Sequence, residues 1–165
     1  MPEKRTIERA RRDKREGKSP STQAGEFVRE EIHHVREGKH GARSTKQAIA
    51  IGLSKARRAG VKLPVPRRGT ASESTRAEAR RANKAGAKRT KRRPSRARSR
   101  GALRRLRRYG RAAASHEALA RQARSVARKR TAKQRSASAR KAVRTKGPMK
   151  RRAAARKAAR TRARA

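Results

Sequence analysis

Apolar and polar residues recur with a helical period most clearly between Pro20 and Gly38. The apolar positions there are three or four residues apart, which places them on one face of a helix: Ala24, Phe27, Val28, Ile32 and Val35. Ser19 is a suitable N-terminal cap before a proline in the first helical position, and Gly38 stands where a left-handed C-terminal cap is expected. The pattern predicts an amphipathic helix between these two caps.

A second amphipathic helix is predicted after Ser44 and ends at Gly60. The Ser44 hydroxyl and Gln47, three residues later, are the two partners of a reciprocal capping box. Because only a short loop joins the two helices, we expect them to pack face to face as a hairpin, with Gly52 allowing close approach. The stripe that would face the first helix consists of Ala48, Ile49, Gly52, Leu53 and Ala56.

Residues 2–17 predict a shorter helix that is mostly charged. Opposite charges recur there four residues apart, as in Glu8 and Arg12, while the apolar stripe is thin. The three helices together predict an all-α head domain, residues 1–63. The apolar faces of the hairpin are larger than this thin helix can cover, so the head is also predicted to form a homodimer through them.

The chain changes character after residue 63. Two X-Pro pairs at residues 63–66 favour extended backbone, and the Ser, Thr and Gly residues that follow indicate a linker, residues 64–76. Residues 77–165 form a low-complexity tail in which ASARKAVRT at 137–145 returns as AAARKAART at 153–161. Dense like charge at helical spacing opposes helix formation in water. The tail is therefore predicted to be mostly disordered, or helical only when phosphates screen it.

Short helices are still predicted inside the tail. Ser115 is a suitable cap for a segment in which Leu119, Ala123 and Val126 are aligned. Glycine and proline residues are expected to divide the tail into short pieces: Gly86, Pro94, Gly101, Gly110, Gly147 and Pro148.

Charge indicates the class of partner. The chain of 165 residues has 55 Lys and Arg against 11 Asp and Glu, a net charge of +44, of which +35 lies after residue 63. Its two aromatic residues, Phe27 and Tyr109, leave too little apolar surface for a large core. Self-repulsion at this charge opposes compaction unless a polyanion neutralises it. The predicted partner is DNA, bound through its phosphates with little sequence preference.

Candidate nucleic-acid contacts fall in the loop from Gly38 to Gly41, at the start of the following helix, and along the tail. The small glycines would let a phosphate approach the loop closely, and the N–H groups that open the helix after Ser44 point outward and could bind it. Alternatively, the glycines only turn the chain between the two helices. A GXXG loop between helices is also how KH modules hold a nucleic-acid backbone, but the sheet of a KH fold has no counterpart here. The candidates are Lys39, Arg43, Ser44, Lys46, Arg92, Arg93, Arg104, Arg105, Arg107, Arg108, Arg128, Lys129, Arg140, Lys141, Arg156 and Lys157.

No motif predicts catalysis, since the sequence has no cysteine, no H-E-x-x-H, no Walker loop and no dinucleotide-binding glycine motif. Glu30 and Glu31 adjoin basic residues and are interpreted as solvated ion-pair partners rather than as acid–base groups. We expect a protein that is not an enzyme and uses no cofactor or small-molecule substrate. The absence of a long apolar run or an apolar leader predicts a soluble, cytoplasmic protein without a membrane partner.

Three of the four histidines, His33, His34 and His40, lie close together in the sequence near Glu30 and Glu37. Imidazole and carboxylate groups bind metals, but adjacent histidines point about 100° apart on a helix, so one site could not easily use both. We interpret them as histidines of the helix surface and predict no metal site.

The head resembles a known family. The stretch KHGARSTKQAIAIGLSKARRAG, within residues 1–63, is similar to a domain of unknown function at the start of small basic bacterial proteins that are often labelled DNA-binding. This resemblance implies a bacterial protein associated with DNA in the nucleoid, and it supplies no catalytic residues. The tail resembles bacterial linker-histone-like tails in composition only.

Two alternatives share this composition. One is an RNA- or ribosome-associated basic protein, and the other is an adaptor whose head recruits a protein while its tail holds DNA. Base reading by the head would use Thr45, Lys46 and Gln47 at the start of the helix after Ser44. The sequence favours a non-enzymatic, histone-like DNA-binding protein.

Overall fold

The computed structural model describes residues 2–88 and 95–163, without the side chains of residues 145 and 146. The described chain contains helices and no strand, which confirms the predicted all-α class. It divides into two compact units, Met1–Gln122 and Ala123–Ala165. The elements are α1 (Lys4–Arg15), α2 (Pro20–Arg36), α3 (Thr45–Arg58), α4 (Glu73–Ala87), α5 (Arg96–Arg107), the 3-10 turn η1 (Ala112–Ala114), α6 (His116–Arg128) and α7 (Ala132–Arg162).

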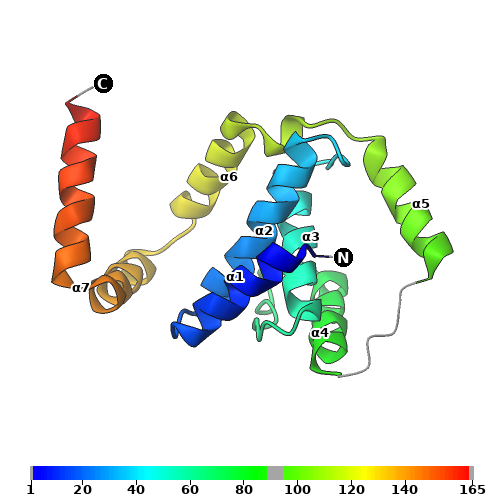
Figure 1. Cartoon of the computed structure of the whole chain (residues 1–165), viewed down its shortest axis with the longest axis horizontal. Coiled ribbons are helices and arrows are strands. Elements are labelled where there is room, and N and C mark those ends of the chain that lie inside the picture. Colours follow the sequence, from blue (N-terminus) through cyan, green and yellow to red (C-terminus); the bar gives the residue numbers. More distant parts are fainter. Residues whose placement is uncertain (1, 89–94, 164–165) are drawn as a thin grey trace. The chain divides into compact units, whose positions relative to one another are not determined.

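The predicted hairpin is formed by α2 and α3, and α1 packs against α2 (Figure 1). The two hairpin helices approach closely at Gly52, where a Cβ atom would lie 2.7 Å from the Cα of Val28. Gly38 ends α2 with a φ of +75°, the left-handed conformation expected of a glycine cap. The sequence pattern therefore placed all three helices of the head and the close approach of two of them at Gly52.

Half of the predicted capping box forms at the start of α3. The Ser44 hydroxyl accepts a hydrogen bond from the Gln47 amide at 3.2 Å. The Gln47 side chain reaches one residue further back than expected and accepts from the Arg43 amide at 2.7 Å. This second bond fixes the end of the loop that leads into α3.

Two hydrophobic clusters fill the first unit. One lies between α1, α2, the end of α3 and the segment after it, and consists of Ala10, Ala24, Phe27, Ala56, Val61 and Leu63. The other lies at the opposite end of the hairpin and consists of Ile32, Val35, Ala42, Ala48 and Ala114, with Leu119 packed against it. Segments far along the chain thus cover the apolar faces that suggested a homodimer or a recruited protein. The homodimer and the recruited protein both stay predictions.

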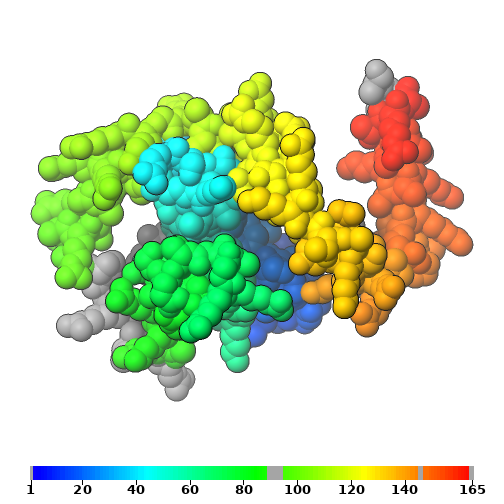
Figure 2. Space-filling view, turned by 180° about the vertical axis from the view of Figure 1, so that it is seen from behind, coloured from blue at the N-terminus to red at the C-terminus, as the bar shows by residue number. Residues whose placement is uncertain are grey.

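The structure does not support a long disordered tail, because the described residues after residue 70 are mostly helical. α4 covers one side of α3 (Figure 2, green). Gly86 allows this contact, since a Cβ there would lie 1.9 Å from the Arg57 carbonyl oxygen. The Asn83 side chain donates to the Leu63 carbonyl at 2.9 Å, and Arg76 donates to the Pro66 carbonyl at 3.0 Å. The compact unit consequently extends past residue 63 to Gln122.

Local sequence explains why the tail forms helices. Alanine and arginine have high helix propensity, and hydroxyl caps stand before α4, α6 and α7 at Ser72, Ser115 and Thr131. Gly86 and Gly101, predicted to break the tail, lie inside helices, whereas Gly147 has a φ of 64° and kinks α7 before Pro148. Pro94 lies outside the described residues, and Gly110 lies between α5 and η1. None of the helices in the described chain is long and apolar enough to cross a membrane.

Candidate functional site

The basic residues proposed to contact nucleic acid lie on the surface wherever the structure describes them. Arg43, Ser44 and Lys46 share the exposed N-terminal end of α3, while Arg92 and Arg93 lie outside the described residues. The remaining candidates are exposed on or beside the later helices: Arg104, Arg105, Arg107 and Arg108 at the end of α5, Arg128 and Lys129 at the end of α6, and Arg140, Lys141, Arg156 and Lys157 on α7.

Few carboxylates are present to neutralise these cations. After Glu78 the sequence contains 35 Lys and Arg residues and a single acidic residue, Glu117. The second compact unit, Ala123–Ala165, carries 18 Lys and Arg and no acidic side chain. None of its described side chains is buried. This part of the chain presents positive charge to whatever surrounds it.

The glycine loop after α2 contacts protein rather than presenting open backbone. The Gly41 amide donates to the Leu106 carbonyl at 3.2 Å, and a Cβ at Gly41 would lie 1.6 Å from the Tyr109 carbonyl oxygen. Thr45 donates to the Ala113 carbonyl at 2.7 Å at the start of α3. The glycines that suggested a phosphate-binding loop thus leave room for the segment between α5 and η1 to pack against the loop.

Lys39, the basic residue of this loop, is paired with carboxylates. Its Nζ lies 2.9 Å from Glu37 Oε2 and 3.5 Å from Glu3 Oε1. The hydrogen bond to Glu37 raises the pKa of Lys39, and the same bond lowers the pKa of Glu37. Lys39 is therefore engaged within the protein, whereas Arg43 and Lys46 point to solvent.

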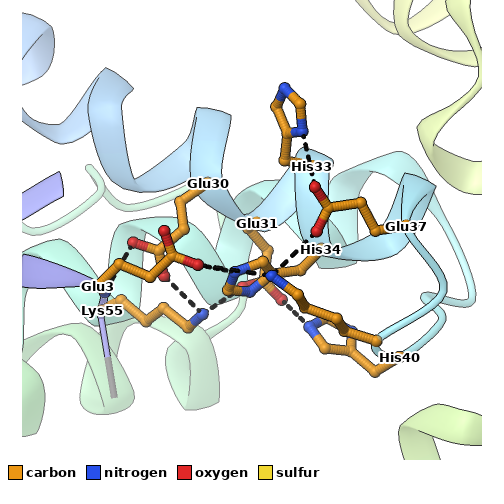
Figure 3. A network of polar contacts seen from close by, with 9 residues as sticks. Glu3, Glu30, Glu31, His33, His34, Glu37, His40 and Lys55 are labelled. Atoms are coloured by element: carbon orange, nitrogen blue, oxygen red, sulfur yellow. Dashed lines mark hydrogen bonds and ion pairs between the residues drawn. The ribbon is translucent and has the colours of Figure 1, made fainter. Parts of the chain in front are cut away.

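A cluster of ionisable side chains that was not predicted lies between α2, α3 and the glycine loop (Figure 3). Glu30 and Glu31 of α2 are only 4% and 0% exposed, so the interpretation of both as solvated residues is wrong. Lys55 of α3 lies 2.6 Å from Glu31 Oε2 and 3.4 Å from Glu30 Oε1. One ammonium group from the facing helix thus pairs with two buried carboxylates, and Glu30 Oε2 also accepts a hydrogen bond from the Glu3 amide at 3.1 Å.

Two histidines complete the cluster. His40 Nε2 lies 3.2 Å from Glu31 Oε1, and His34 Nε2 lies 2.9 Å from Glu3 Oε1. The side chains of His34 and His40 are only 13% and 11% exposed, so they are not the surface histidines that we expected. The hydrogen bond with His34 is the main reason why the pKa of Glu3 is lowered.

His33 points away from this cluster, as the 100° separation of adjacent helical residues requires. Its side chain is 64% exposed and lies 3.5 Å from Glu37 (Figure 3). Adjacent histidines thus face different surroundings, as expected, and His33 and His34 do not share a site. His34 and the loop histidine His40, by contrast, do lie together.

The sequence contained a signal for the buried cluster. Glu31 stands four residues after Phe27 and four before Val35, within the apolar stripe of α2. Lys55 stands three residues after Gly52 on the facing stripe. A charged residue at a core position of each helix predicts a buried pair, because an unpaired charge there would be very costly.

These features define an all-α protein whose N-terminal helices enclose an ion-paired carboxylate, imidazole and ammonium cluster and whose later helices are strongly basic. Residues 3–68 match DUF6496, a family of unknown function, which agrees with the resemblance of the head to such a domain. The matched segment contains every residue of the buried cluster. No curated protein and no solved structure matches the chain.

Proposed function

We propose that this protein is a non-enzymatic, histone-like protein that binds duplex DNA through phosphate neutralisation, with little sequence preference, in a bacterial nucleoid. The observation that carries the proposal is the excess of 35 Lys and Arg over one acidic residue after Glu78. Where the structure describes these cations they lie on or between helices with few or no buried residues. Such surfaces repel one another and are stabilised by a polyanion.

Binding is driven by the release of counterions from the DNA. Each phosphate that a Lys or Arg side chain neutralises contributes about −0.9 to the slope of log K against log salt. The 18 cations of residues 123–165 therefore support a steep slope even if half of them engage. Arginine, the more frequent of the two cations, also enters narrow minor grooves, which favours A·T-rich duplexes modestly.

The distribution of aromatic residues favours a duplex over single-stranded nucleic acid. Proteins that hold single strands stack successive bases on aromatic side chains. Phe27, one of the two aromatic residues, is fully buried in the first hydrophobic cluster. Tyr109 alone cannot build such a platform, so we infer that the backbone of a double helix is the target.

A salt titration of the full chain and of residues 1–122 tests this mechanism. The measurement is fluorescence anisotropy on two duplex DNAs of unrelated sequence, a duplex RNA and a single strand, all of one length. Removal of residues 123–165 takes away 18 positive charges and no acidic side chain. We expect this truncation to weaken DNA binding at every salt concentration and to lower the slope by about 8 if nine phosphates are released from contact.

A matched pair of substitutions tests the contribution of the head. Arg43→Ala together with Lys46→Ala, at the exposed start of α3, should lower the salt slope by about two at most. Unchanged affinity and slope in residues 1–122, or strong discrimination between the two DNA sequences, would contradict tail-driven binding. A clear preference for duplex RNA would instead support an RNA-associated protein.

A further inference from the structure

Three side chains of the buried cluster have the composition of a metal-binding site. Glu31, His34 and His40 each offer one ligand atom, and these atoms all lie within 4.8 Å of one another. Two ligands come from α2, three residues apart, and the third comes from the glycine loop. The three groups share one face because residues three apart on a helix are neighbours and the loop folds back over them.

The orientation of His40 is that of a metal ligand. Its Nδ1 lies 3.1 Å from the carbonyl oxygen of Gly41, and a carbonyl can only accept, so Nδ1 carries the proton. In the neutral ring Nε2 then has a lone pair, and it faces Glu31 Oε1 at 3.2 Å. Metal-binding histidines typically donate their other ring N–H to a backbone carbonyl in this way. With a neutral ring, Nε2 and Oε1 are two acceptors that face each other, and a metal ion between them would satisfy both, as a second ring proton would.

Glu31 is held in position for the same role. Lys55 approaches its Oε2, which leaves Oε1 directed toward His40. The Glu31 carboxylate is completely buried and receives no hydrogen bond of regular geometry from any described residue, although these two cationic or imidazole partners are close. Its remaining coordination capacity points into the cluster.

The charge of the cluster also calls for a further cation. The two buried carboxylates, Glu30 and Glu31, contribute two negative charges against the single ammonium of Lys55, when both imidazoles are neutral. Glu3, which is half exposed, is paired with Lys39 instead, so one negative charge of the buried groups is left for a bound cation to compensate. A buried charge surplus is costly unless such a partner compensates it.

We propose that Glu31, His34 and His40 bind a zinc-class divalent ion that fastens the glycine loop to α2. Two imidazoles and a carboxylate suit zinc, whereas magnesium and calcium prefer ligands that are all oxygen. Zinc–ligand bonds of about 2.0 to 2.1 Å place tetrahedral donors about 3.3 Å apart, which is close to the 3.2 Å between His40 and Glu31. His34 moves in to complete the set, with the Glu3 carboxylate beside its ring.

A metal ion can reach the three ligands from the surface, and its binding would affect how the loop packs. A surface hollow lined by Glu3, Glu30, His34 and Lys39 opens beside the cluster. The loop that carries His40 also receives the Leu106 carbonyl and the segment that follows it. Metal binding would therefore stabilise the docking of residues 106–114 as well as the loop, independently of any nucleic acid.

Zinc titration of the full chain, freed of nucleic acid, tests the site. The sequence has no cysteine and four histidines, so every imidazole can be assessed separately. We expect one equivalent of Zn²⁺ to bind by calorimetry, to raise the thermal midpoint, and to be replaced by Co²⁺ with the visible absorption of a tetrahedral centre. His34→Gln and His40→Gln should each weaken binding at least about tenfold, since loss of even an outer partner of a metal ligand costs that much.

The matched controls are His33→Gln, next to His34 on the same helix, and His116→Gln at the start of α6. Both should bind zinc as the parent protein does. Circular dichroism establishes that each variant retains its helices, and Co²⁺ absorption of the unmodified chain gives a reading that needs no variant. Failure of the parent protein to bind one equivalent, unchanged affinity in both test variants, or an equal loss in His33→Gln would overturn the proposal.

Discussion

Lys55 supplies the positive charge that compensates two carboxylates in the interior of the hairpin. It is the cation nearest to both Glu31 and Glu30, and these carboxylates are almost completely removed from solvent. A pair of this kind adds little net stability compared with apolar residues of the same size, but removal of one partner leaves a buried charge without compensation. The cost of such a change is therefore much larger than the cost of losing a surface ion pair.

Lys55→Met should lower the free energy of unfolding by about 3 kcal/mol. The control is Lys62→Met, which replaces an exposed lysine shortly after α3 and should change it by about 0.5 kcal/mol or less. Urea unfolding in the presence of a chelator measures both values without a contribution from bound metal. Equal stability of the two variants would show that Lys55 does not compensate the buried carboxylates.

For single residues, the sequence predicted local roles, such as helix caps, better than it predicted which residues contact one another in the fold. Gly38 and Ser44 have the cap roles that their positions indicated. His40 lies in a loop without periodicity, so no pattern in the sequence could connect it to Glu31. That contact exists only because the loop closes over α2, which is a property of the folded chain.

The helices themselves divide into those with large apolar side chains and those with small ones. α2 and α3 carry Phe, Val, Ile and Leu at helical spacing, and the sequence placed them accurately for that reason. α4 buries only Ala79 and Ala82, and it approaches α3 through Gly86. A helix that packs through alanine and glycine has a sequence that is hard to distinguish from low-complexity sequence, which is why the docking of α4 was not predicted.

Gly86 and Gly101, which lie inside α4 and α5, provide a direct test of that docking. Gly86→Ala should lower the free energy of unfolding by about 2 kcal/mol or more, because its Cβ would overlap the Arg57 carbonyl. Gly101→Ala in α5 has no atom within 4 Å of the new Cβ and should raise helix stability by about 0.5 to 1 kcal/mol. Urea unfolding of both variants is the measurement. Gly86→Ala as stable as the parent would show that α4 does not lie against α3.

The start of α4 should also respond to acid. A hydrogen bond from Arg80, together with Arg76, lowers the pKa of Glu73. A carboxyl group whose pKa is lowered by folding stabilises the folded state above its unfolded pKa, and this contribution is lost as the pH falls through the folded pKa. We therefore expect Glu73→Gln to show a smaller loss of stability on acidification than the parent protein. Acid titration followed by circular dichroism would reveal superimposable profiles if Glu73 made no such contribution.

For the whole molecule, the buried residues and much of the charge are in different parts of the chain. All the hydrophobic clusters found in the described residues belong to Met1–Gln122, whereas residues 123–165 have 18 cations and no buried described side chain. The sequence indicated such a division from the uneven distribution of charge, and the X-Pro pairs with the linker composition after them placed the boundary at residue 63. The contacts of residues 64–114 with the hairpin were not predicted, because they involve few large apolar residues.

Deletion of residues 123–165 should therefore leave the thermal midpoint within about 2 °C of that of the full chain, since a change of about 0.5 kcal/mol shifts the midpoint of a domain of about 100 to 150 residues by about 2 °C. The deletion also removes positive charge and so lowers the electrostatic self-repulsion of the chain, which opposes any small loss of stability. Differential scanning calorimetry without nucleic acid or added metal is the measurement. A large fall in the midpoint would mean that the second unit supports the first.

The burial of Ala114 has a consequence for the order of events during synthesis. Ala114 completes a hydrophobic cluster with Val35 and Ala48, and its carbonyl accepts a hydrogen bond from Arg36, 78 residues earlier. Contacts between residues so distant in sequence close late and slow the folding of small domains. The hairpin leaves the ribosome well before this partner does, so the nascent chain exposes the apolar end of α2 and α3 until residue 114 emerges. During that interval the hairpin is the segment of this protein most exposed to aggregation and to capture by chaperones.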